Sequence, residues 1–376
     1  METKIIAFHL PQFHQIPEND AWWGEGFTEW TNVKKAVPLY EGHYAPRVPY
    51  HEKYYDLTDL SVLKWQAYLA NEYGVDGFAY YHYWFNGHKL LEKPLEILLR
   101  HPEINQRYCI SWANEPWTNG WVSADNDILI SHDNRDESDW DAHFDYLSKF
   151  FNDERYIRVD GKPLIILYFP DILQRCTSMI NRWRTLAEIR GYGDLFILYQ
   201  KAMSHFNPMV NRSAFDGGIE FQPGYVWYES KSFLDKRKAE LTFHAANFAK
   251  QKLGLHIHHN EEAAPDVPHI IDYDETWQNI LSLTPDNDRM YPGAFVDWDN
   301  TPRKGVRGSV TQGASPEKFE KYMTQQLRRT YDIYHKDILF LFAWNEWAEG
   351  GYLEPDEKYA HGYLEAIKNA KKNTET

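Results

Sequence analysis

The chain of 376 residues has little cysteine and no excess of positive charge. Its two cysteines, Cys109 and Cys176, cannot build a disulfide framework, and such low usage suits a reducing compartment. The formal net charge is −15, and an acidic chain repels nucleic-acid phosphates and anionic lipid surfaces. We therefore expect neither a nucleic acid nor a membrane surface as a partner.

Long apolar runs are also missing. No stretch approaches the roughly 20 apolar residues that a transmembrane helix requires, so we expect no membrane insertion. The first apolar run, which begins at Ile5, is too short for the core of a signal peptide and is ended by Pro11. The expectation is a cytoplasmic protein, with a removed leader as the alternative.

Aromatic residues, in contrast, are abundant. They make up 16% of the chain, including 15 Trp and 26 Tyr. Most of these rings should belong to the core, where aromatic side chains dominate the packing energy. The remainder would suit a glycan-binding surface, because aromatic faces pack against the C–H faces of sugar rings.

Short apolar runs bounded by Gly, Pro, Asp or Asn predict eight buried parallel strands. Amphipathic stretches between them predict helices, for example after Thr58 and after Ser315, which are suitable N-caps. This alternation predicts an α/β fold, a single (β/α)8 TIM barrel spanning residues 1–376. A doubly wound open sheet is disfavoured, because no glycine-rich phosphate loop follows the first strand. The predicted strands cover residues 4–10, 75–83, 107–112, 164–169, 195–199, 215–221, 291–296 and 337–344.

Two segments are longer than a barrel requires. Residues 11–56 predict a long first loop folded over the carboxyl-terminal face of the barrel. Residues 224–288 predict an elaborated sixth loop with a helix near 239–251 and a histidine-rich stretch at 256–259. No repeat or low-complexity linker interrupts the chain, which favours one domain.

The carboxyl ends of the predicted strands carry both aromatic and polar residues. Active sites of TIM barrels lie at these ends. Trp and Tyr beside carboxylate, amide or imidazole groups can stack on sugar rings and bind their hydroxyls. The predicted substrate-binding residues are His9, Trp23, Tyr81, His82, Trp84, Trp112, Asn114, Glu115, Trp117, Tyr168, Glu220, Gln222, Asp297, Trp298, Trp344, Asn345 and Trp347.

Glu346 and Glu349 are the predicted catalytic residues. Cleavage of a glycosidic bond commonly uses two carboxyl groups, and two Glu residues three apart after the last strand can both face the barrel mouth. Trp347 between them can shield one and raise its pKa, as a general acid requires. Glu115 in Asn-Glu-Pro is the main competitor, since it resembles the acid/base motif of many retaining barrel glycosidases. The simpler interpretations are that Glu349 caps or salt-bridges the following loop, and that Glu115 is a substrate-binding or structural carboxylate.

Metal and phosphate chemistry have weaker support in the sequence. The histidines lack compact ligand spacing, so we expect no catalytic metal and no cofactor. Asp297 and Asp299 could bind sugar hydroxyls or form a turn. Arg303 and Arg307 could meet an anionic group, but a solvated loop is the expected setting.

Several strings resemble the WbsX-type proteins of bacterial polysaccharide gene clusters. They are the long string Trp-Trp-Gly-Glu-Gly-Phe-Thr-Glu-Trp-Thr-Asn-Val at 22–33, Tyr-His-Tyr-Trp-Phe-Asn-Gly at 81–87, Trp-Ala-Asn-Glu at 112–115 and Trp-Asp-Asn-Thr-Pro-Arg at 298–303. The resemblance extends from about residue 4 to about residue 366. Proteins of this type are often labelled glycosyltransferases.

The string Trp-Asn-Glu-Trp-Ala-Glu-Gly at 344–350 also resembles the catalytic segment of glycoside hydrolase family 99, the endo-α-mannosidases. This resemblance implies a (β/α)8 barrel and a retaining mechanism through a 1,2-anhydro sugar. It implies that Glu346 deprotonates the substrate 2-hydroxyl, and that Glu349 protonates the leaving oxygen and later activates water. Ala348 departs from the His that is often found there, so the leaving-group side need not bind the same glycan.

Three functions remain open at this point. The favoured one is a retaining glycoside hydrolase or transglycosylase acting on a bacterial polysaccharide or related glycan. The others are a glycosyltransferase of O-antigen or capsular polysaccharide synthesis and a non-catalytic glycan-binding barrel. A close Glu pair in a barrel without a glycine-rich phosphate loop favours the hydrolase.

Overall fold

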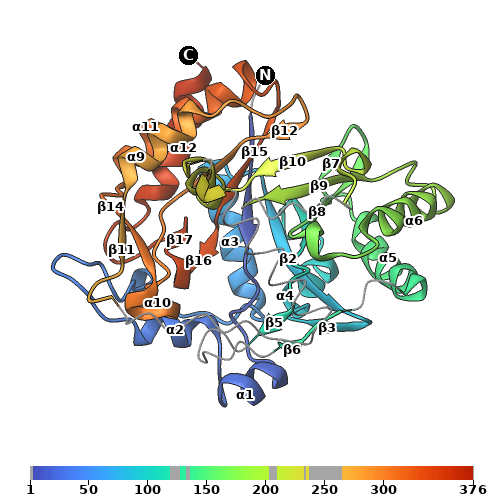
Figure 1. Ribbon diagram of the computed structural model, residues 1–376. Coiled ribbons are helices and arrows are strands. Elements are labelled where there is room, and N and C mark those ends of the chain that lie inside the picture. Colours follow the sequence, from blue (N-terminus) through green and yellow to red (C-terminus); the bar gives the residue numbers. More distant parts are fainter. Residues whose placement is uncertain are drawn as a thin grey trace.

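The computed structural model describes residues 3–118, 128–132, 136–202, 210–232, 234–236 and 265–375. Within these residues, nine parallel strands form one continuous sheet (Figure 1). In spatial order they are β12 (Met290–Tyr291), β10 (Gly217–Glu220), β9 (Phe196–Lys201), β8 (Lys162–Leu167), β4 (Tyr108–Trp112), β2 (Gly77–Phe85), β1 (Lys4–His9), β15 (Ile338–Phe342) and β13 (Gly293–Phe295).

The sheet closes through β12 and β13, which are two pieces of one strand divided at Pro292. β12 pairs with β10, and β13 pairs with β15, all in parallel. The result is a TIM barrel of eight strand positions, and each of the eight predicted strands overlaps one of them. The prediction of the fold class is therefore confirmed.

These strands are apolar on both faces because one face meets the barrel interior and the other meets the surrounding helices. β2 shows this most clearly, since all nine of its residues are buried. Short antiparallel additions extend two barrel strands: β3 (His88–Leu90) pairs with β2, and β7 (Arg158–Val159) pairs with β8.

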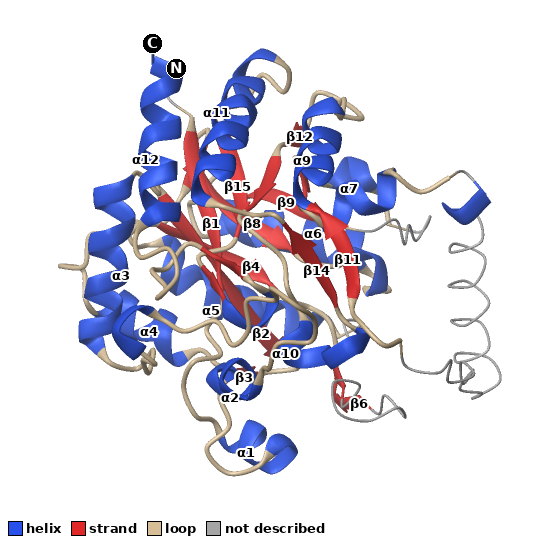
Figure 2. Cartoon of the chain, turned by 90° about the vertical axis from the view of Figure 1, so that its left-hand side faces the viewer, coloured by secondary structure: helices blue, strands red, loops and turns tan. Residues whose placement is uncertain are grey.

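Helices cover the outside of the sheet (Figure 2). The Ser315 side chain accepts a hydrogen bond from the Lys318 backbone at 3.4 Å, as an N-cap should. The first long helix is capped by Asp59 rather than by the predicted Thr58, whose hydroxyl instead bonds Asp56. The covering helices are α3 (Leu60–Tyr73), α4 (Lys93–Arg100), α5 (Glu137–Phe151), α6 (Cys176–Ile189), α7 (Gly224–Glu229), α9 (Tyr273–Ser282), α11 (Pro316–Asp332) and α12 (Gly362–Glu375).

The long first loop, residues 11–56, lies at the carboxyl ends of the strands. Its helices α1 (Pro17–Trp23) and α2 (Glu29–Lys35) lie at the end of the molecule opposite the two termini, and α2 lies beside α10 (Thr301–Lys304) (Figure 1). α2 contacts both α10 and the turn at Trp347–Glu349. The first loop therefore reaches the segment that holds Glu346 and Glu349.

The second long loop, residues 224–288, is described in part. It contains α7, the strand β11 (His269–Asp272) and α9, and β11 pairs in parallel with β14 (Ser309–Gln312). The predicted helix near 239–251 and the histidines at 256–259 lie outside the described residues.

Both cysteines are buried and carry free thiols. Among the helices that the structure describes, none has the length and apolar character needed to cross a membrane.

Candidate active site

An aromatic layer lines the barrel interior near the carboxyl ends of the strands. Alternate residues of a strand face opposite sides of a sheet. The Phe8 ring stacks on Tyr81 at 5.7 Å, and the Tyr81 ring contacts Tyr168 edge-on at 6.0 Å, which places all three inside the barrel. Tyr83, two residues after Tyr81 on β2, falls on the same face.

Arg303 joins the two predicted catalytic residues. Its Nη1 donates to Glu349 Oε1 at 2.5 Å, and its Nη2 lies 3.5 Å from Glu346 Oε2. Its Nε donates to Glu29 Oε1 at 2.8 Å. Only 7% of the Arg303 side chain is exposed. One buried guanidinium thus holds three carboxylates, in the planar multi-donor geometry that arginine provides.

Local structure brings Arg303 to this position. Pro302 occupies the first turn of the four-residue helix α10, where its fixed φ is favourable. The partner Glu29 begins α2 in the first loop, and Asn32 of the same helix donates to its carboxylate at 3.2 Å. The expectation that Arg303 lies in a solvated loop is wrong, whereas Arg307 is exposed as expected.

The two glutamates lie on a short irregular segment after β15. β16 (Asn345–Glu346) pairs with β17 (Gly351–Tyr352), and the turn at Trp347–Glu349 connects them. Gly350 ends that turn with φ +71°, and a Cβ there would lie 2.7 Å from the Asp299 nitrogen. The same nitrogen donates to the Glu349 carbonyl at 2.7 Å. Glycine is therefore required for this close approach.

The surroundings of the two carboxyl groups differ. Glu346 is almost fully buried, and burial, followed by the charge of Glu349, raises its pKa well above the usual value. The Glu349 side chain is 20% exposed and has the shorter contact with Arg303. A pair in which one carboxyl favours the neutral form beside a cation-bound partner suits acid–base chemistry.

Glu115 is a third carboxyl close to this pair. It is accessible to solvent, yet the surrounding protein and, second, the charge of Glu349 raise the pKa of Glu115 to about 7. Burial is the main cause of the raised pKa of the Tyr168 hydroxyl, and the charges of Glu115 and Glu349 raise this pKa further. Glu115 therefore lies on the same side of the barrel as the predicted catalytic pair.

Five predicted substrate-binding residues lie instead on the outer face of the strands. His9 contacts Gln66 of α3 at 3.1 Å, and His82 contacts His143 of α5 at 3.0 Å. The expectation that these residues line the barrel mouth is wrong. Successive side chains of a strand point to opposite faces of the sheet, and these point toward the helices. The other three are Trp84, which donates to Asp139, Trp112, which packs on Trp183, and Glu220, which accepts from Tyr334.

Six more of the predicted residues are buried in structural contacts. Each holds a neighbouring backbone or side-chain group through at least one contact within the protein. They are Asn114 with Phe169, Asn345 with Leu10, Gln222 with Val226, Asp297 with Arg47 and Thr311, and both Trp344 and Trp347 with Glu354.

Three predicted tryptophans remain partly exposed. Trp117 contacts Tyr83 edge-on at 5.1 Å and so lies next to the inner aromatic layer. Trp298 contacts Phe342 of β15 at 5.6 Å. Trp23 belongs to α1 in the first loop and contacts Phe27 at 6.0 Å. Their exposed rings are available to stack on a sugar.

The acidic pair Asp297 and Asp299 forms part of a charged network within the protein. Arg47 contacts Asp297 at 2.8 Å and Asp299 at 3.8 Å, and His43 contacts Asp299 at 3.0 Å. The described part of the chain has no group of three or more His, Cys, Asp or Glu side chains that could hold a metal ion.

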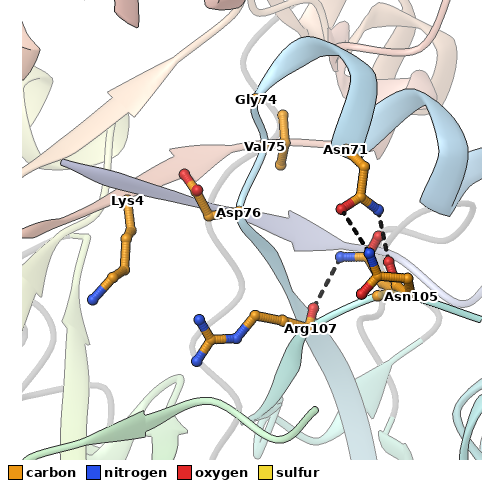
Figure 3. A pocket seen from close by; sticks show the side chains of 8 residues that line it. Lys4, Asn71, Gly74, Val75, Asp76, Asn105 and Arg107 are labelled. Carbon is orange, nitrogen blue, oxygen red and sulfur yellow. Dashed lines mark hydrogen bonds between the residues drawn. The ribbon is translucent and has the colours of Figure 1, made fainter. Parts of the chain in front are cut away.

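A separate hollow lies at the opposite end of the barrel from the glutamates (Figure 3). Lys4, Asp76 and Arg107 line it, together with Asn71 and Asn105, which are hydrogen-bonded to each other. This end holds the amino termini of the strands, where residues of TIM barrels serve stability rather than catalysis.

Four residues that belong to the site or support it were not among the predicted site residues. They are Glu29, Tyr83, Arg303 and Glu354. Two signals were present. Glu29 and Arg303 both lie in strings that carry the WbsX resemblance, and Tyr83 shares the strand parity of Tyr81. No local sequence signal marks Glu354, because its four partners are brought together only by the fold.

The fold and the site together define a class: TIM-barrel proteins with a carboxylate–arginine cluster at the carboxyl ends of the strands. A family model described as "Glycosyltransferase WbsX" matches residues 5–367. The chain belongs to this family.

Two curated relatives match nearly the whole chain. Both are described as "Uncharacterized protein WxcX", from two strains of Xanthomonas campestris pv. campestris. Each is 34% identical over 372 residues, which is 98% of this chain and 50% of the relative. The chain therefore spans about half the length of these relatives.

Two solved structures share the fold. A GH99 endo-alpha-mannosidase from Bacteroides thetaiotaomicron is 12% identical, with a TM-score of 0.52 covering 99% of this chain and 97% of that one. A structure described as a glycoside hydrolase-like protein is 13% identical, with a TM-score of 0.56 covering 98% and 94%. At these identities the likeness concerns the fold alone.

Proposed function

We propose that the protein is a retaining glycoside hydrolase, or a transglycosylase, that acts on a bacterial polysaccharide or a related glycan. The observation that carries the proposal is the position of Arg303, which contacts both Glu346 and Glu349 at the carboxyl ends of the strands. Because the two carboxyl groups share one guanidinium, both can act on one sugar ring. Cleavage of a glycosidic bond commonly uses such a pair.

The family resemblance gives each glutamate a role. Glu346 takes the proton of the substrate 2-hydroxyl, whose oxygen attacks the anomeric carbon and forms a 1,2-anhydro sugar. Glu349 gives its proton to the leaving oxygen and then takes one from the water that opens the ring, while Glu346 returns its proton to the 2-oxygen. Two displacements at the same carbon retain the configuration. Arg303 stabilises whichever carboxylate carries charge, and the partly exposed Trp117 and Trp298 supply stacking surfaces.

The pKa of Glu346 in the unliganded protein bears on which glutamate is the acid and which is the base. Burial favours the neutral form of Glu346, whereas its role as base needs the ionised form. Aryl glycosides with graded leaving groups separate the roles. Loss of the acid harms poor leaving groups most, and loss of the base harms all of them alike. We expect the graded effect for Glu349→Gln and the uniform effect for Glu346→Gln. The reverse pattern would exchange the roles.

The first experiment is a turnover screen on a glycan panel that begins with α-mannosides, since one of the similar solved structures is an endo-alpha-mannosidase. The unchanged protein should release sugar from at least one member. Glu349→Gln should lose turnover while calorimetry still detects binding of that glycan. Full activity in this variant would refute the assignment.

A glycosyltransferase is the second candidate, because the family description carries that word. Asp297-Trp298-Asp299 has the Asp-x-Asp spacing of a metal–diphosphate site. Both of these aspartates contact Arg47, which supports the hydrolase. Calorimetry with nucleotide sugars decides the question, since a transferase must bind one. A glycan-binding barrel without catalysis would bind panel members and turn over none.

A further inference from the structure

Glu354 is a buried carboxylate that lies two residues after β17 and outside the predicted site. It is 2% exposed, and each of its oxygens accepts two hydrogen bonds. Oε1 accepts from Gln66 Nε2 at 2.7 Å and from Trp344 Nε1 at 3.0 Å. Oε2 accepts from Tyr55 Oη at 2.7 Å and from Trp347 Nε1 at 2.7 Å. This uses the full usual acceptor capacity of a carboxylate.

The four donors come from three parts of the chain. Trp344 and Trp347 flank Glu346 on the segment that carries both predicted catalytic residues. Tyr55 ends the long first loop, and Gln66 belongs to α3 on the outside of the barrel. Glu354 therefore ties the catalytic segment to the first loop and to the helix layer at a single point.

The catalytic segment depends on such side-chain contacts. It consists of the two-residue strand β16 and a single turn, and so has few repeating backbone hydrogen bonds of its own. The Trp347 ring is held on both sides, stacked on Tyr352 at 3.8 Å and packed against Trp30 at 5.4 Å. Its indole nitrogen donates to Glu354, which sets the rotation of the ring between the two glutamates.

We infer that Glu354 is a positioning residue that sets the placement of Glu346 and Glu349. The inference rests on the proposed function. Only a carboxylate can accept from four donors here. A glutamine keeps the shape but has one oxygen, and its NH2 group would face two donors in place of an acceptor. The catalytic segment would then shift to relieve the unpaired donors, and a shift of about 1 Å is costly in an active site.

The test compares Glu354→Gln with the control Glu220→Gln. Glu220 is equally buried but faces the outer helices, and among the described residues it accepts a hydrogen bond from Tyr334 alone. For Glu354→Gln we expect kcat on the aryl glycosides to fall ~10–100-fold with KM within about twofold. The indole N–H resonances of Trp344 and Trp347 should shift, and a crystal structure should show Glu346 and Glu349 displaced. The control should change none of these.

Tyr55→Phe gives a second, milder variant that removes one donor and keeps the carboxylate. It should lower kcat severalfold and move the Trp347 indole resonance. Unchanged kcat in both variants, or an undisplaced catalytic segment in Glu354→Gln, would overturn the inference. If the unchanged protein turns over no glycoside, the proposed function fails. The crystal structure and the indole resonances still decide whether Glu354 positions the segment.

Discussion

The inner and outer faces of the same strand ends carry similar residues and do different things. On the inside, Tyr81, Tyr83 and Tyr168 lie close enough to Glu346 for its charge to raise the pKa of each hydroxyl, in addition to burial. On the outside, His82, Trp84 and Glu220 are buried against helices, and each has a hydrogen-bond partner there. An aromatic residue beside a carboxylate is thus compatible with both settings. Strand parity, rather than residue type, separates the proposed substrate surface from a core contact.

The largest expected effect contrasts one carboxyl group from each face. Glu346→Gln should lower kcat/KM by ~10²–10⁴-fold, the usual contribution of a general acid or base. Glu220→Gln should change it by less than about twofold, because the Glu220 side chain is hydrogen-bonded to Tyr334 of the outer layer. Steady-state kinetics on the best panel substrate measures both. Equal losses in the two variants would erase the distinction between the faces.

The second prediction concerns the buried cation of the inner face. Arg303→Met leaves the carboxylates of Glu29, Glu346 and Glu349 without their shared partner, which should destabilise the protein by ~3–5 kcal/mol at pH 7. Urea unfolding measures this free energy. The difference in unfolding free energy between Arg303→Met and the unchanged protein should shrink as the pH falls, since the unpaired carboxylates then become neutral.

Arg307→Met is the matched control, four residues further along the same connection but exposed to solvent. Its unfolding free energy should stay within ~0.5 kcal/mol of the unchanged protein. If Arg303→Met is as stable as this control, the carboxylate cluster does not depend on its guanidinium.

The third prediction uses pH on the outer face. Burial raises the pKa of Glu220 to about 7, so the folded protein holds this proton when the unfolded chain has released it. Between the two pKa values the folded state binds more protons, and stability therefore falls as the pH rises from about 4.5 to 7. Glu220→Gln should remove up to about 3 kcal/mol of that fall. Unfolding curves measured across this range test the prediction. It would be contradicted if the unfolding free energies of the unchanged protein and of Glu220→Gln vary in parallel with pH.

The smallest expected effects compare one aromatic residue from each face. Trp84→Phe removes the indole hydrogen bond to Asp139 and should cost about 1 kcal/mol of stability with kcat/KM unchanged. Tyr168→Phe removes a hydroxyl near Glu115 and Glu349 and should lower kcat/KM roughly fivefold, equivalent to about one hydrogen bond. Thermal melts and kinetics on both variants test the contrast. A kinetic defect in Trp84→Phe alone would reverse the assignment of faces.

The sequence was sufficient to predict the barrel because parallel strands buried on both faces stand out as short apolar runs. All eight runs overlap observed strands, and the break at Pro292 was the main detail missed. The position of Glu346 and Glu349 after the last strand followed from the same count. Their spacing also indicated that both could lie at one end of the barrel, where Arg303 contacts both.

The sequence was insufficient wherever long-range contacts decide the role of a side chain. His9 and Trp112 end strands, but whether such a residue faces inward depends on the register against its neighbours. Arg303 lies in a polar segment, and contacts with residues distant in the chain make it a buried partner; one of them, Glu29, is 274 positions away. Glu354 likewise depends on Tyr55 and Gln66, which are distant in the chain.

The central claim is that the carboxyl groups around Arg303 cleave a glycosidic bond with retention. The most direct measurement is proton NMR of the anomeric signals at the first time points of glycan cleavage, before the free sugar equilibrates. The account predicts that the first product has the anomeric configuration of the substrate, and that Glu349→Gln forms none. A first product of inverted configuration, or undiminished cleavage by Glu349→Gln, would contradict it.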